Sequence, residues 1–227
     1  YYPIMDAQMP LENISAILFD LDGTLIDSET ITDRAVGELL TQHNIDTKGL
    51  DFLQFHGISW QRLELILKER YPTLADVEVL GYLEKRFYEI SQTEPPPLLP
   101  GARETFLAAN AQVPTAIVTG SGASDVEAFL DRADLRQACS FYLSYEMYSP
   151  SKPDPSCYLM AAERLNLPPD QCLVFEDSLP GLSAARTAGM PTIALTYSSP
   201  PPPPGLADRM IEDYTHLPVD FFHTITT

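Results

Sequence analysis

The stretch ISAILFDLDGTL, residues 14–25, decides the fold. Its first half is a short, largely apolar run of the kind that forms a buried strand, and Asp20 stands where that run ends. Gly23 follows closely and favours a turn. The sequence therefore predicts a strand that delivers two carboxylates, Asp20 and Asp22, to the loop after its end.

The same alternation recurs along the rest of the chain. Four further runs have the apolar character of strands: residues 113–118, 141–143, 172–175 and 192–195. Four stretches have helical patterns: residues 101–111, 124–132, 155–166 and 179–188. Strands that alternate with helices predict an α/β fold, a parallel sheet with helices on both faces. Open parallel sheets place ligands beyond their strand ends, so we expect the polar residues there to share one crevice.

The long segment between the first strand and Pro100 is expected to be helical throughout. Its helical patterns are at residues 27–43, 48–55, 59–70 and 75–91. We expect an inserted helical cap at residues 27–98 and a core formed by residues 1–26 and 99–227. The connections near Asp27 and at the prolines 95–97 are the expected hinges.

The amino-acid composition limits the classes of partner that the chain can bind. The 227 residues include 14 Lys and Arg against 32 Asp and Glu, a formal net charge of -18. This charge argues against nucleic acid and anionic membranes as partners, and no apolar stretch of roughly 18 residues could span a bilayer. An anionic substrate therefore needs a local metal ion, cation or cluster of amides. Three cysteines without metal-like spacing favour a reduced, cytoplasmic setting, and we expect a monomer or weak dimer.

Asp20 and Asp22 flank a single leucine, so both carboxylates can reach one side of a turning backbone near a shared metal ion. One acid can attack phosphorus while the other protonates the leaving oxygen and later takes a proton from water. A calcium loop of the EF-hand type is excluded because it needs glycine at its sixth position, and Gly23 would be fourth. An acidic surface turn remains the structural alternative.

Two more polar motifs could bind phosphate. Thr119, followed by Gly120 and Ser121, offers a hydroxyl and backbone amides to phosphate oxygens, or else caps the next helix. Lys152 could neutralise both the attacking carboxylate and the phosphate, although an isolated lysine is usually solvent-exposed. Both motifs are compatible with phosphoryl transfer.

An acidic pair ends the strand-like run at residues 172–175. Glu176 and Asp177 are adjacent carboxylates, which are costly to hold together unless a cation or hydrogen-bond donors compensate. Mg²⁺ prefers carboxylate, carbonyl and water oxygens. The pair therefore favours a magnesium site.

Residues 20–25, 119–121, 152–155 and 175–178 have the composition and order of the four motifs of the haloacid dehalogenase superfamily, which the chain resembles over nearly its whole length. The resemblance implies a Rossmann-like three-layer core and magnesium-dependent phosphoryl transfer, with Asp20 phosphorylated and Asp22 as acid and base. The residues that it implies for phosphate are Thr119, Gly120, Ser121 and Lys152. Those that it implies for Mg²⁺ are Asp20, the Asp22 carbonyl, Asp177 and, directly or through water, Glu176.

Asp22 also separates branches of this superfamily. Dehalogenases lack an acid there and phosphonate-cleaving members usually have alanine, so the resemblance implies a phosphate ester as substrate. The helical insertion resembles the small cap of the subgroup that contains sugar-phosphate phosphatases, phosphoglycolate phosphatases and β-phosphoglucomutase. Two features depart from the pattern: Ser151 stands where glycine often precedes the motif lysine, and the prolines 200–204 have no counterpart.

In this subgroup the cap supplies specificity, so the loop at residues 56–59 and the helix after it are the expected substrate contacts. His56 belongs to this loop. Trp60 either stacks on a sugar face or packs within the cap. Arg62 either pairs with an anionic group of the substrate or faces solvent.

Three alternatives to a phosphatase share features with this sequence. A mutase shares all four motifs, but β-phosphoglucomutases have histidine about a dozen residues after the nucleophile, where this chain has Thr32. A phospho-acceptor switch domain has its acidic pair before the acceptor aspartate, which is the reverse of the order here. A degenerate interaction module, acting through the prolines 200–204, is the lowest-ranked reading because every expected catalytic position is filled.

Overall fold

A computed structural model describes residues 11–56, 58 and 60–226, and within them the core is a parallel sheet. Its strands are β1 (Ala16–Phe19), β2 (Thr115–Val118), β3 (Cys139–Leu143), β4 (Cys172–Glu176), β5 (Thr192–Leu195) and β6 (Arg209–Ile211). They lie in the order β3-β2-β1-β4-β5-β6 and every pair is parallel. The strand order reverses between β1 and β4, which is where such sheets place ligands.

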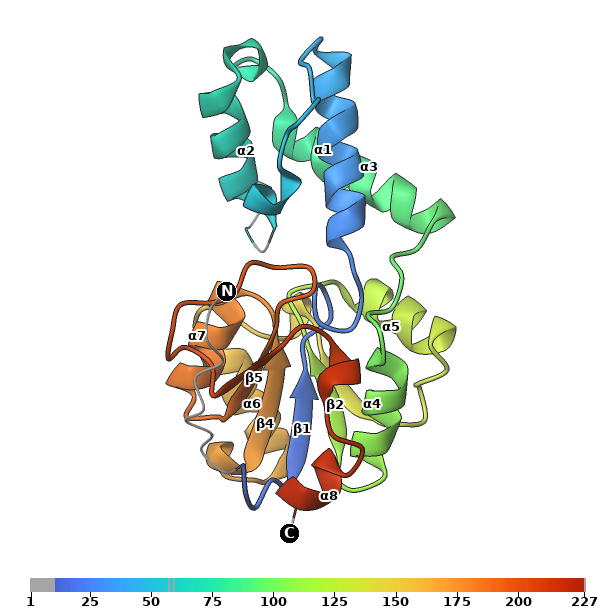
Figure 1. The fold of residues 1–227 in the computed structure, drawn as a ribbon, viewed down its shortest axis with the longest axis vertical. Coiled ribbons are helices and arrows are strands. Elements are labelled where there is room, and N and C mark those ends of the chain that lie inside the picture. The colour runs from blue at the N-terminus through green and yellow to red at the C-terminus, as the bar shows by residue number, and fades with distance from the viewer. Residues whose placement is uncertain (1–10, 57, 59, 227) are drawn as a thin grey trace.

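Helices cover both faces of this sheet (Figure 1). They are α4 (Ala102–Asn110), α5 (Ala123–Arg132), α6 (Ser156–Leu165), α7 (Leu179–Thr187) and α8 (Phe221–Ile225). Alternate strand residues point to opposite faces: Ile17 and Phe19 pack in a cluster with α4, α5 and α8, while Ala16 and Leu18 pack with α6 and α7. Because both faces are buried, the central strands are apolar at nearly every position, as the sequence predicted.

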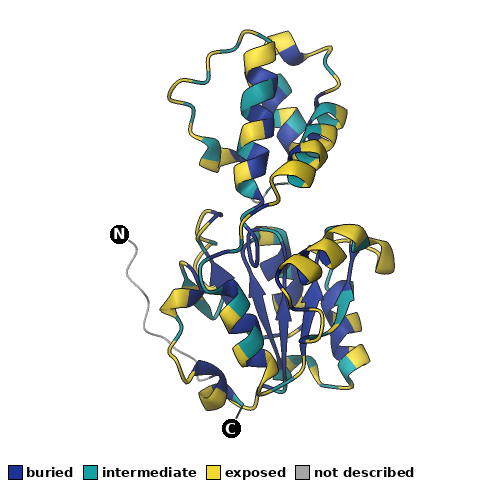
Figure 2. Ribbon diagram, turned by 90° about the vertical axis from the view of Figure 1, so that its right-hand side faces the viewer, coloured by how far each residue is buried: buried dark blue, intermediate teal, exposed yellow. Residues whose placement is uncertain are grey.

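A second group of helices lies beyond the carboxyl ends of the strands (Figures 1 and 2). It contains α1 (Glu29–Gln42), α2 (Trp60–Arg70) and α3 (Val79–Thr93), with 3-10 turns at Phe52–Phe55 and Pro72–Leu74. Their buried side chains form a cluster of their own, drawn from residues 31–90. Two chain segments connect it to the core, where the Asp27 N–H donates to the Pro97 carbonyl at 2.9 Å. This packing supports the cap boundaries 27–98 that we propose.

The cap departs from the sequence prediction in two places. The helix predicted at residues 48–55 is only a 3-10 turn, because Gly49 has φ of +77° and the Asp51 carboxylate accepts from the Leu53 N–H. The helix predicted from residue 75 begins at Val79, after the turn at Pro72–Leu74. Two residues of the predicted substrate loop, 57 and 59, lie outside the described part of the chain.

The carboxyl-terminal region contains elements that the sequence analysis missed. The short edge strand β6 and the helix α8 complete the sheet and cover it. Between β5 and β6 the prolines 200–204 form no helix or strand and are mostly exposed, as expected of a surface loop. No helix in the described residues is long and apolar enough to cross a membrane.

Candidate active site

The four motifs meet at the carboxyl end of the sheet. Asp20 follows β1, Thr119 follows β2 and Asp177 follows β4, while Lys152 comes from the loop between β3 and α6. These positions are far apart in sequence and adjacent in space because β1 lies between β2 and β4. The polar residues expected beyond the strand ends are therefore brought together at one edge of the sheet.

Lys152 lies at the centre of this site. Its Nζ donates to Asp20 Oδ1 at 2.6 Å, to Glu176 Oε1 at 2.7 Å and to the Val118 carbonyl at 3.0 Å. The ammonium also lies 5.0 Å from the centre of the Tyr158 ring. The side chain is only 10% exposed, so the structural alternative of a solvent-facing lysine is wrong. A buried cation is thus held beside the proposed nucleophile.

Glu176 orients this lysine. Its Oε1 accepts from Lys152, and its Oε2 accepts from the Asp177 N–H at 2.8 Å and the Ser178 N–H at 2.7 Å. The side chain has no solvent exposure. These donors occupy most of its acceptor capacity, which suits a contact with a metal ion through water better than a direct one.

Gly181 is needed for this arrangement. A Cβ at this position would fall 1.5 Å from Glu176 Oε1, whereas one at Gly81, in the first turn of α3, would meet nothing within 4 Å. We expect Gly181→Ala to lower the free energy of unfolding by about 2 kcal/mol through overpacking. Gly81→Ala is expected to raise it by about 0.5 kcal/mol through helix propensity. Urea unfolding of both variants checks this, and equal stability of the two would contradict the packing described.

Three carboxylates form a potential metal site. One oxygen of each of Asp20, Glu176 and Asp177 lies within 4.8 Å of the others, and all three residues are buried. Lys152 supplies one positive charge against these three acids, so a divalent cation would balance the cluster. Oxygen donors of this kind suit Mg²⁺, and the residues therefore fit that ion.

The pKa values of these carboxyl groups also favour a bound cation. Burial raises the pKa of Asp20 to about 8, with Lys152 lowering it and the charges of Glu176 and Asp22 raising it. Burial also raises the pKa of Asp177 well above its usual range, and Glu176, Asp20 and Glu29 add to that effect. A bound cation would favour the ionised carboxylates that nucleophilic attack and metal binding both require.

Of the remaining motif residues, Ser121 contacts both Asp22 and Thr119. The Ser121 hydroxyl donates to Asp22 Oδ2, and the Ser121 N–H donates to Thr119 Oγ1 at 3.0 Å. Thr119 does not cap the next helix, because α5 has Gly122 at its N-cap and no side-chain hydrogen bond there. The Thr119 hydroxyl hydrogen is thus available to a phosphate oxygen, and the adjacent Gly120 is exposed.

The cap candidates differ in what they contact. The His56 ring lies between Asp33 Oδ1, at 2.8 Å from Nε2, and the Ser198 carbonyl, at 2.5 Å from Nδ1. Trp60 packs edge-on against Phe87 within the cap cluster, which is the packing alternative to a sugar contact. Arg62 is exposed on α2. The Ser198 contact connects His56 to the core.

Two functional candidates escaped the sequence analysis. The Ser199 hydroxyl donates to Asp177 Oδ2 at 2.5 Å, and the Ser198 hydroxyl donates to Asp27 Oδ1 at 3.0 Å. Both serines follow the buried strand β5, so the rule that ligands lie beyond strand ends would have indicated them.

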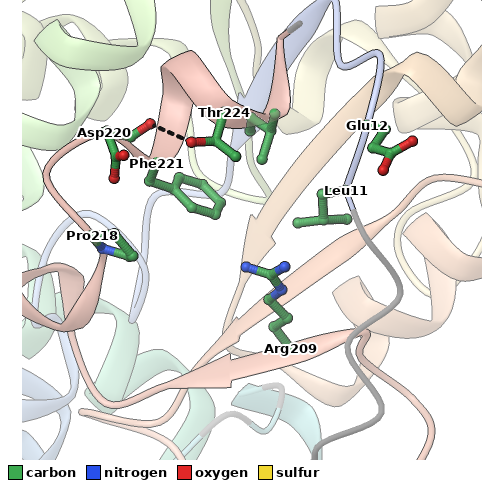
Figure 3. A pocket seen from close by; sticks show the side chains of 8 residues that line it. Leu11, Glu12, Arg209, Pro218, Asp220, Phe221 and Thr224 are labelled. Carbon is green, nitrogen blue, oxygen red and sulfur yellow. Dashed lines mark hydrogen bonds between the residues drawn. The ribbon is translucent and has the colours of Figure 1, made fainter.

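A hollow of about 340 Å³ lies elsewhere in the core (Figure 3). It is lined by Leu11, Glu12, Arg209, Pro218, Asp220, Phe221, Thr224 and Ile225. The Arg209 side chain extends into the space beside Leu11 and Phe221. This hollow lies at β6 and α8, and none of its described lining residues belongs to a motif, so we assign it no part in the chemistry.

The chain belongs to the haloacid dehalogenase-like hydrolases, whose family model matches residues 14–189. The motif residues at the ends of β1, β2 and β4 lie within this match. The resemblance drawn from the motifs is thereby confirmed, together with the α/β fold.

Two curated relatives of the chain are named as phosphatases. The chain is 29% identical over 209 residues to a phosphoglycolate phosphatase of Salmonella choleraesuis, covering 82% of this chain and 83% of that one. It is 28% identical over 185 residues to a fructose-1-phosphate phosphatase of Escherichia coli, covering 80% and 96%. Among solved structures, a family hydrolase from Deinococcus radiodurans with bound phosphate and sodium has a TM-score of 0.72 at 28% identity, covering 88% and 91%. The chain is accordingly a phosphoric monoester hydrolase.

Proposed function

We propose that the chain is a magnesium-dependent phosphatase that hydrolyses a small phosphate monoester, a sugar phosphate or similar metabolite, through an aspartyl-phosphate on Asp20. The observation that carries this proposal is the buried contact of Lys152 with both Asp20 and Glu176, beside the carboxylate of Asp177. We infer the dependence on Mg²⁺ and the aspartyl-phosphate intermediate from this arrangement and from the family resemblance. A cytoplasmic monomer or weak dimer stays a prediction.

The reaction takes two steps. Asp20 attacks phosphorus, so an Asp20–phosphorus bond forms while the bond to the ester oxygen breaks, and Asp22 gives that oxygen its proton. Asp22 then takes a proton from water, which attacks phosphorus and releases phosphate and Asp20. Bound Mg²⁺ would supply charge neutralisation of the phosphoryl oxygens.

The protein groups have defined tasks in these steps. Lys152 holds the attacking Asp20 oxygen and can contact the transferring phosphoryl group. The Ser121 hydroxyl fixes one oxygen of Asp22 and leaves the other for the leaving group. Thr119 can donate its hydroxyl hydrogen to the phosphate. The cap, beyond the carboxyl ends of the strands, would exclude water during the first step.

Charges on the cap side favour a neutral, hydroxylated leaving group. Asp27 and Glu29 lie where the chain enters α1, and the negative charge of Glu29 acts on the pKa of both His56 and Asp177. A second anionic group on the substrate would be repelled there, whereas sugar hydroxyls can donate to carboxylates. This supports a sugar phosphate over phosphoglycolate.

We therefore expect kcat/KM for fructose 1-phosphate to exceed that for phosphoglycolate by about 10-fold or more, because like charges in a crevice repel. Steady-state phosphate release measures both values. Arg62→Ala should leave the fructose 1-phosphate value nearly unchanged. A preference for phosphoglycolate that disappears in Arg62→Ala would contradict this substrate class and would assign Arg62 to a carboxylate.

The activity itself is tested by phosphate release from sugar phosphates, phosphoglycolate and nucleotides, with Mg²⁺ and with a chelator. Release that requires Mg²⁺ and is absent in Asp20→Asn supports the proposal. Conversion of glucose 1-phosphate to glucose 6-phosphate without net release would favour the mutase. The Thr32 hydroxyl donates to the Ser28 carbonyl of its own helix turn, which gives no support to that alternative.

A further inference from the structure

Two adjacent serines connect the metal-binding acids to the cap. Ser198 and Ser199 follow β5 and are 4% and 5% exposed, although they belong to a loop. The Ser199 hydroxyl donates to Asp177 Oδ2 at 2.5 Å, and the Ser198 hydroxyl donates to Asp27 Oδ1 at 3.0 Å, at the first residue of the proposed cap. Neighbouring side chains thus contact a proposed metal ligand and a hinge.

His56 adds a second contact between the cap and this core loop. Its Nδ1 lies 2.5 Å from the Ser198 carbonyl oxygen and its Nε2 lies 2.8 Å from Asp33 Oδ1, and the side chain is 8% exposed. Both partners are acceptors, and a neutral imidazole has one N–H. The two hydrogen bonds together therefore need the doubly protonated ring.

The surroundings of the ring support that state. Burial lowers the pKa of His56, but the hydrogen bond to Asp33, the charge of Glu29 and the Ser198 carbonyl outweigh it and raise the pKa to about 9. Asp33 and Glu29 lie on α1, whereas the carbonyl comes from the core loop. His56 is thus a cation held between cap and core at neutral pH.

Asp177 is held from two directions. Thr24, in the loop after β1, donates to Oδ1 at 3.1 Å, while Ser199 donates to Oδ2. Asp177 also packs directly against the backbone of Gly23, where a Cβ would fall 2.1 Å from Oδ2. The Thr24 contact stays within the core, but the Ser199 contact depends on a loop whose neighbouring residue is bound by the cap.

We propose that Ser198 and Ser199, the serine pair, are positioning residues that couple the seating of the cap, through His56, to the orientation of the Asp177 carboxylate. When the cap moves away and the His56 contact breaks, the Ser198 carbonyl loses its hydrogen-bond donor and the loop is less well fixed. The hydrogen bond from Ser199 to Asp177 is then weaker. Metal affinity then falls. By linkage, a metal ion bound at Asp177 favours the seated cap. The proposal rests on the proposed function only for the assignment of Asp177 as a metal ligand.

Calorimetric titration with Mg²⁺ alone tests this coupling without any turnover. We expect Ser199→Ala to weaken Mg²⁺ binding by about 10-fold, because it removes a donor to a ligand carboxylate. We expect His56→Ala to weaken it by about 3-fold through the loop, since it acts at one remove. The double variant should match Ser199→Ala. The controls are His43→Ala at the end of α1 and Ser183→Ala on α7, and both should bind as the unaltered chain does.

Several outcomes would overturn the coupling. The coupling is wrong if His56→Ala binds Mg²⁺ as tightly as the unaltered chain. It is also wrong if the losses of affinity in His56→Ala and Ser199→Ala multiply in the double variant. If His56→Ala does not fold by circular dichroism, His56→Gln, which keeps a donor for the Ser198 carbonyl, replaces it. Coupling then predicts affinity within about twofold of the unaltered chain, and a loss as large as that of Ser199→Ala contradicts it.

The protonation state has its own test. A side-chain nitrogen–proton correlation spectrum at pH 8 should show both ring nitrogens of His56 protonated, with His56→Gln identifying the signals. A neutral ring at that pH would contradict the double contact. Neither readout needs substrate, so an inactive chain that passes both tests would sink the phosphatase proposal and leave this one standing.

Discussion

Asp20→Asn is expected to reduce phosphate release by about 10⁴-fold or more, because an amide cannot form the covalent bond to phosphorus that starts the reaction. The substitution keeps the shape of the side chain, and one amide oxygen remains to accept from Lys152, which in the structure lies 2.6 Å from Asp20 Oδ1. The loss should therefore appear in kcat while the fold is retained.

The measurement is phosphate release under saturating substrate and Mg²⁺, with circular dichroism as the check on folding. Asp208→Asn serves as the matched control, since Asp208 lies just before β6 and pairs with Thr192 away from the motifs. It should retain nearly full activity. Turnover in Asp20→Asn within tenfold of the unaltered chain would remove Asp20 from the role of nucleophile.

Lys152→Met is the second large effect. The variant keeps an unbranched side chain that is one atom shorter and removes the charge that contacts Asp20 and Glu176. We expect activity to fall by about 10³-fold, as for loss of a buried group that stabilises transferring charge. In chelator, the free energy of unfolding should fall by about 3 kcal/mol, because the buried carboxylates lose their compensating cation.

Two comparisons make this result specific. Lys85→Met removes a lysine that is 78% exposed on α3, and both activity and unfolding should stay near those of the unaltered chain. Mg²⁺ should restore part of the stability of Lys152→Met, since it also neutralises the acids. A variant as stable in chelator as the unaltered chain would show that the cluster is held by other means.

The central strands and the convergence of the motifs were predictable from the sequence. Apolar runs that end in Asp20, Thr119 and Glu176 indicate buried parallel strands with polar ends, and parallel strands present those ends at one edge. The family resemblance added the roles of the residues. Both depend on local patterns that a single chain displays.

Other features depend on tertiary packing and carry little local signal. The edge strand β6 is three residues long, and the helix predicted at residues 48–55 is replaced by a turn at Gly49. The contacts of His56 with Ser198 join residues 142 positions apart, and no periodicity indicates such a pair. Trp60 could be assigned to the cap interior only once Phe87 was seen beside it.

The intermediate on Asp20 is the central claim, and trapping it tests that claim most directly. An aspartyl-phosphate is reduced by borohydride to homoserine, whereas a free carboxylate is not. The chain is mixed with Mg²⁺ and a substrate that it hydrolyses, quenched with borohydride and mapped by peptide mass spectrometry. It should contain homoserine at position 20, and Asp20→Asn should contain none. Phosphate release with an unreduced Asp20, or with homoserine at another aspartate, would contradict the account.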